Sequence, residues 1–70
     1  MKTKRFYVIT VQNKKDLTAR VSQEAYFDYE GAKRFIESRS DKPKQIIPFK
    51  FESALNIYLI HEVYANKEII

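Results

Sequence analysis

Apolar and polar side chains alternate along much of this chain, but one run near its C-terminal end departs from that rule. Residues 55–65 read LNIYLIHEVYA, with apolar side chains at both the odd and the even positions. A strand with one face in water alternates, whereas a strand covered on both faces does not. Leu55–Ala65 is therefore expected to be a central strand, with the protein's own helix on one side and a partner as the candidate for the other.

The first half of the chain predicts two strands. Lys4–Gln12 is rich in β-branched and aromatic residues, which suits a strand. Residues 13–16 are polar turn formers and are expected to close a hairpin. Leu17–Phe27 then has apolar residues at most odd positions and polar ones at the even positions 18–24, which is typical of a half-exposed edge strand.

A helix is predicted directly after this second strand. Asp28 is a good N-cap because its carboxylate can accept amide protons that have no partner in the first helical turn. The following residues 29–37 place an apolar stripe at helical spacing, so the helix is expected to lie on a sheet. The members of the stripe are Tyr29, Ala32, Phe35, Ile36 and the aliphatic stem of Arg39.

A loop over Ser38–Lys44 leads to a third strand, Gln45–Glu52, in which Pro48 lacks an amide proton and so favours a sheet edge or a bulge. The expected fold class is α+β, a single small domain over residues 1–70 in the order β-β-α-β-β. It has a four-stranded sheet with one helix packed on one face. The expected strand order is 2-1-4-3, and the helical crossover predicts that the first and last strands are parallel neighbours.

Composition and motifs predict a protein that is not an enzyme. The chain has no cysteine, one histidine and one glycine, which leaves no thiolate metal site and no glycine-rich phosphate loop. His61 and Glu62 point to opposite faces of a strand, so they are not expected to act as one acid–base pair. We expect no catalytic residue, no metal, no cofactor and no small-molecule substrate, and the absence of cysteine is consistent with a cytoplasmic protein. No apolar run approaches the ~20 residues that span a membrane.

The binding hypothesis depends on which side chains the helix covers. The side chains assigned to the helix side are Tyr7, Ile9, Val11, Val21, Phe27, Phe49, Ile57, Leu59 and Val63. The other face then carries an apolar and aromatic set, which is typical of a surface for a protein partner or a second copy. The predicted partner-binding residues are Phe6, Tyr26, Tyr58, Ile60 and Tyr64.

Nucleic acid is the alternative partner, because the net charge is +4 and six of the thirteen basic residues fall within positions 1–20. Aromatic rings between cations suit a single-strand binder, where bases stack and cations meet phosphates. The residues predicted for this role are Lys4, Arg5, Lys14, Lys15, Arg20 and Lys50. Acidic residues at 24, 52 and 62 on the same face favour a protein partner instead, and cover by the tail Ile69–Ile70 is a third alternative.

The function predicted from these observations is a small binding module that engages a protein or itself, for example as an inhibitor or adaptor encoded by a phage or mobile element. The Lys-, Ile- and Tyr-rich composition resembles that of low-GC bacteria and their phages and plasmids. That resemblance implies a setting and no mechanism.

Overall fold

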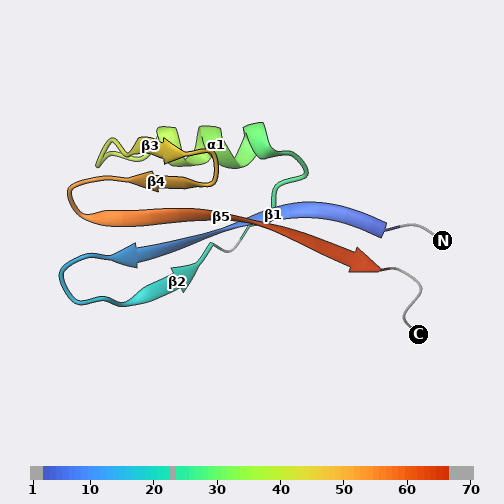
Figure 1. Cartoon of the computed structure of the whole chain (residues 1–70), viewed down its shortest axis with the longest axis horizontal. Helices are drawn as coiled ribbons and strands as arrows, with labels where there is room; N and C mark the ends of the chain where they lie inside the picture. Colours follow the sequence, from blue (N-terminus) through green and yellow to red (C-terminus); the bar gives the residue numbers. More distant parts are fainter. Residues whose placement is uncertain (1–2, 23, 67–70) are drawn as a thin grey trace.

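The described part of the protein folds as one helix on an antiparallel sheet of five strands (Figure 1). The computed structural model describes residues 3–22 and 24–66. Neighbouring strands are all antiparallel and follow the order β2-β1-β5-β4-β3. The elements are β1 (Thr3–Asn13), β2 (Ala19–Val21), α1 (Tyr29–Glu37), β3 (Lys44–Ile47), β4 (Lys50–Glu52) and β5 (Asn56–Asn66). The α+β class is confirmed, and the tail residues 67–70 lie outside the described part of the chain.

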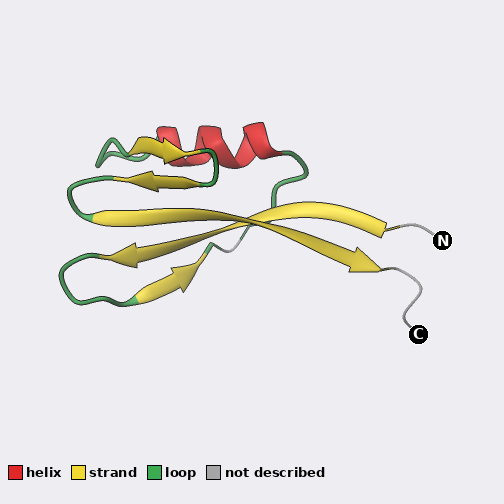
Figure 2. Cartoon of the chain, in the orientation of Figure 1, coloured by secondary structure: helices red, strands yellow, loops and turns green. Residues whose placement is uncertain are grey.

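The predicted third strand is divided into two by a tight turn. Ile47 and Lys50 pair across the turn that Pro48 and Phe49 form, so β3 and β4 make a hairpin (Figure 2). Proline has its φ angle fixed near the value that a turn requires, and its missing N–H is not needed there. This added reversal of direction makes β5 antiparallel to β1, so the prediction of parallel neighbours was wrong.

The helix begins and ends where its sequence indicates. The Asp28 carboxylate accepts the N–H of Gly31 at 2.7 Å, which confirms the predicted N-cap. A Cβ on residue 31 would lie 3.0 Å from that same carboxylate oxygen, so glycine leaves room for the cap. Ala32 and Ile36 are fully buried, and the guanidinium of Arg39 lies 5.4 Å from the centre of the Phe35 ring.

The core lies between α1 and one face of the sheet, and it uses the even positions of β5. Ile9 pairs with Ile60, and Val11 pairs with Tyr58, so these four side chains share the helix side. The helix side was correctly assigned in β1 and wrongly assigned in β5, because both sets of positions in β5 are apolar and only the pairing with β1 decides between them. The buried apolar residues are Tyr7, Ile9, Ala32, Ile36, Phe51, Tyr58 and Ile60.

The second predicted strand is mostly irregular. Only Ala19–Val21 forms a ladder with β1, and Tyr26 makes an isolated bridge to Tyr7 farther along. Tyr26 packs on Phe35 at a ring distance of 5.9 Å, whereas Phe27 is 86% exposed. Val21 pairs with Thr10 on the sheet face away from α1. The expectation that Val21 and Phe27 face the helix was therefore wrong.

The hairpin of β3 and β4 closes one end of the core with aromatic rings. Phe49 stacks on Tyr29 with ring centres 5.4 Å apart, and it meets Tyr7 edge-on at 6.5 Å. The Tyr29 hydroxyl donates to the carbonyl of Pro48 and accepts from the Gln45 amide at 3.0 Å. Phe49 was correctly assigned to the helix side.

The two long strands give the molecule its shape. β1 and β5 pair over eleven residues each and continue beyond the end of α1 toward the two termini (Figure 1). The principal dimensions are 43 × 23 × 18 Å. In the described part of the chain, no helix has the length and apolar character needed to cross a membrane.

Candidate interaction face

The sheet face opposite α1, called the open face below, carries a cluster of apolar side chains. Within residues 3–22 and 24–66, no helix or second sheet lies on it. The pairing registers place the odd positions of β5 and the even positions of β1 on this face. Its apolar residues are Phe6, Val8, Val21, Ile57, Leu59 and Val63.

Leu59 lies near the middle of the open face. It pairs with Thr10 of β1 on one side and with Lys50 of β4 on the other, and Val21 follows beyond Thr10. Leu59 is 37% exposed and Val21 is 62% exposed. Soluble monomers seldom leave a large contiguous apolar patch in water, so this cluster is the candidate interaction surface of the fold.

Only one of the five predicted partner residues lies on the open face. Phe6 does, whereas Tyr58 and Ile60 are in the core with 0% and 3% exposure. Tyr26 packs beside the helix, and Tyr64 is 61% exposed opposite Arg5, on the other side of the sheet. The predicted aromatic surface is thus not formed, because the register of β1 with β5 turns the even positions of β5 toward α1.

The residues missed by sequence analysis are the odd positions of β5, above all Ile57 and Leu59. A signal for them was present in the second half of the first hairpin. Five of the six odd positions of residues 17–27 are apolar, yet Leu17, Val21 and Phe27 are all exposed. Of these three, Val21 lies in the edge strand β2 and shares the open face with Leu59, whereas Leu17 and Phe27 lie outside the strands.

The predicted nucleic-acid-binding cations whose side chains the structure describes do not gather on one surface. Arg5 pairs with Glu62 at 3.3 Å, and Lys14 pairs with Glu52 at 2.5 Å. Lys50 belongs to the open face, whereas Arg20 lies on the helix side, in register with Val11. Lys15 is in the exposed turn after β1, and the side chain of Lys4 is outside the described part of the structure.

His61 also lies on the open face, because it shares the odd positions of β5 with Leu59 and Val63. Its Nε2 atom is 2.9 Å from the hydroxyl oxygen of Thr10. Glu62 points to the opposite face, where it meets Arg5. The described residues hold no group of three or more His, Asp or Glu side chains that could bind a metal ion.

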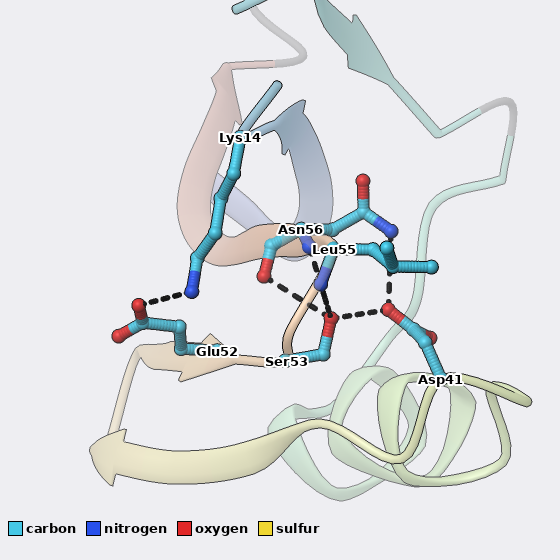
Figure 3. A network of polar contacts seen from close by, with 6 residues as sticks. All are labelled: Lys14, Asp41, Glu52, Ser53, Leu55 and Asn56. Carbon is cyan, nitrogen blue, oxygen red and sulfur yellow. Dashed lines mark hydrogen bonds and ion pairs between the residues drawn. The ribbon is translucent and has the colours of Figure 1, made fainter.

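A polar cluster ties the loop after α1 to the turn between β4 and β5 (Figure 3). The Asp41 carboxylate accepts hydrogen bonds from the Ser53 hydroxyl, from the Asn56 amide at 3.0 Å and from the Tyr58 hydroxyl at 2.9 Å. Ser53 in turn accepts the backbone N–H groups of Leu55 at 3.1 Å and Asn56 at 2.9 Å. The cluster therefore fixes the start of β5 against the rest of the fold.

The pKa values in this cluster follow from its contacts. Burial raises the pKa of Asp41, but the hydrogen bonds from Ser53, Asn56 and Tyr58 together hold it below its ordinary value. Burial and the hydrogen bond to Asp41 raise the pKa of Tyr58 above its ordinary value. Asp41 is thus a charged acceptor for three neighbouring donors, a role that stabilises the fold.

The chain matches no family model, no curated protein and no solved structure.

Proposed function

We propose that the protein is a non-enzymatic interaction module that forms a homodimer by packing two open faces against each other. The observation that carries this proposal is the apolar cluster around Leu59 on a sheet face that no described helix or strand covers. Removing that cluster from water is favourable by about 25 cal/mol per Å² of apolar surface. A cytoplasmic location is part of the same proposal.

The shape of a twisted sheet supports a second copy as the partner. Strands twist with a fixed hand, so one such sheet is matched in shape by another with the same twist. Two sheets then pack with strands aligned to within about 30° and about 10 Å between them. A two-fold axis places the same patch on both subunits, as isologous dimers require.

The size of the molecule is sufficient for this interface. A standard interface takes roughly 800 Å² from each partner, which corresponds to a patch about 23 Å wide and about 35 Å long. The open face follows β1 and β5, which lie along a molecule 43 Å long and 23 Å wide. In such a dimer the helices occupy the two outer layers.

Leu59→Glu is expected to convert the dimer to a folded monomer, because it buries a carboxylate against its own symmetry mate. The measurement is sedimentation equilibrium up to millimolar concentration, with circular dichroism to verify folding. Phe27→Glu is the matched control, since Phe27 is an exposed apolar residue outside the strands and helix and should leave the dimer intact. A wild-type protein that remains monomeric at millimolar concentration would rule out the proposal.

A further inference from the structure

A groove lies on the helix side of the sheet, between β2 and α1. Its central hollow of about 350 Å³ is lined by Val11, Arg20, Ser22, Phe35 and Arg39 among others. A second hollow of about 290 Å³ shares Val11 and Arg20 with it, and a third of about 290 Å³ shares Ser22 and Phe35. These shared residues make one continuous groove, called the β2–α1 groove below.

Two arginines line the middle of this groove. Arg20 comes from β2, and Arg39 follows the end of α1. The ion pairs among the described residues use Arg5 and Lys14 and neither of these two. A guanidinium presents a planar fork of donors that fits a carboxylate with two parallel hydrogen bonds.

Arg39 is partly fixed in position before any ligand arrives. Its guanidinium lies 5.4 Å from the centre of the Phe35 ring, within the range of a cation–π contact. An arginine already held by its neighbours loses less side-chain entropy when it binds. Phe35 and Val11 line the same hollow as the two arginines and provide apolar surface there.

The distribution of charge along the groove indicates what fits it. Asp16 lies at one end and Glu24 at the other, with the two arginines between them. A ligand with acidic groups in its middle and none at its ends therefore complements the groove. The groove runs along β2 through three adjoining hollows, so it suits an extended chain more than a compact small molecule.

We propose that the β2–α1 groove binds an extended acidic peptide segment of a protein partner, with carboxylates held by Arg20 and Arg39. This site lies on the opposite side of the sheet from the open face, so it remains accessible in the proposed dimer and does not depend on it. Apolar side chains of the same peptide pack on Phe35 and Val11.

The test is an NMR titration of the ¹⁵N-labelled protein with the capped peptide Val-Glu-Val-Glu-Val and with its matched Val-Gln-Val-Gln-Val counterpart. The acidic peptide is expected to shift amide signals of residues 20–22 and 35–39, and the glutamine peptide to bind at least tenfold more weakly. Equal affinity for the two peptides would overturn the proposal, and this comparison needs no variant protein.

Variants locate the site independently. Arg20→Gln and Arg39→Gln are each expected to weaken the acidic peptide about tenfold, while Lys15→Gln, which removes an exposed cation outside the groove, leaves affinity unchanged. Equal weakening by all three variants indicates only a general charge effect and contradicts the proposal. Inorganic phosphate that shifts the same amides at lower concentration than the peptide overturns it in favour of a simple oxyanion site.

Discussion

Tyr58→Ala is expected to remove most of the protein's free energy of unfolding. Tyr58 is completely buried and is among the largest side chains in the core. Truncating a buried aromatic residue to alanine costs about 3–5 kcal/mol, because a cavity remains where the ring was. A domain of 70 residues has a free energy of unfolding near the low end of the usual range of about 5–15 kcal/mol. Urea denaturation followed by circular dichroism measures the change.

Two companion variants separate the contributions of the Tyr58 ring and hydroxyl. Tyr58→Phe keeps the ring and removes the hydroxyl, which donates to Asp41 and accepts from the Asn56 amide at 3.4 Å, so a loss of about 1–2 kcal/mol is expected. Tyr64→Ala is the matched control, because Tyr64 lies in the same strand on the same side and is 61% exposed. A protein that tolerates Tyr58→Ala as well as Tyr64→Ala would contradict the assignment of Tyr58 to the core.

The features that sequence could predict are those that depend on neighbouring residues. Asp28 needs only the next three residues to cap the helix, and its bond to Gly31 is formed as expected. Ala32 and Ile36 are spaced to share one helical face whatever lies beneath them. The same holds for β1, where strand alternation alone places Tyr7, Ile9 and Val11 on one face.

The features that sequence could not predict depend on pairing between distant segments. In β5, Tyr58 and Leu59 are both apolar, and a shift of one residue exchanges their faces. Only the register that places Val11 opposite Tyr58 resolves this, and that pairing joins residues 47 positions apart. Tyr58 and Ile60, two of the predicted partner-binding residues, were assigned to the wrong face of the sheet for the same reason.

Pro48 shows a second limit of sequence analysis. It was read correctly as unfavourable inside a central strand, but an edge strand, a bulge and a turn all satisfy that requirement. The structure uses the turn, and β3 at the sheet edge also has a register shift between Gln45 and Ile47. The turn reverses the chain once more, which changes the direction of β5 relative to β1.

Asp41→Ala is expected to destabilise the protein by about 2–4 kcal/mol, because it removes the acceptor for Ser53, Asn56 and Tyr58 at once. Asp41→Asn keeps one acceptor oxygen without the charge, so a smaller loss is expected. Asp16→Asn is the control, since Asp16 accepts hydrogen bonds only from Thr18 in an exposed turn. The free energy of unfolding from urea titration at neutral pH ranks the three variants.

The pH dependence tests the charge on Asp41 directly. Its folded-state pKa lies below the ordinary value of 3.8, so the stabilisation is fully present above that value and is lost as pH falls through the folded-state pKa. Asp16 and Glu52 also have lowered pKa values, so the useful quantity is the difference in unfolding free energy between wild type and Asp41→Asn. This difference should be constant near neutral pH and should shrink below pH 3.8. A difference that does not change with pH would show that Asp41 stabilises the fold by shape and hydrogen bonding alone, without its charge.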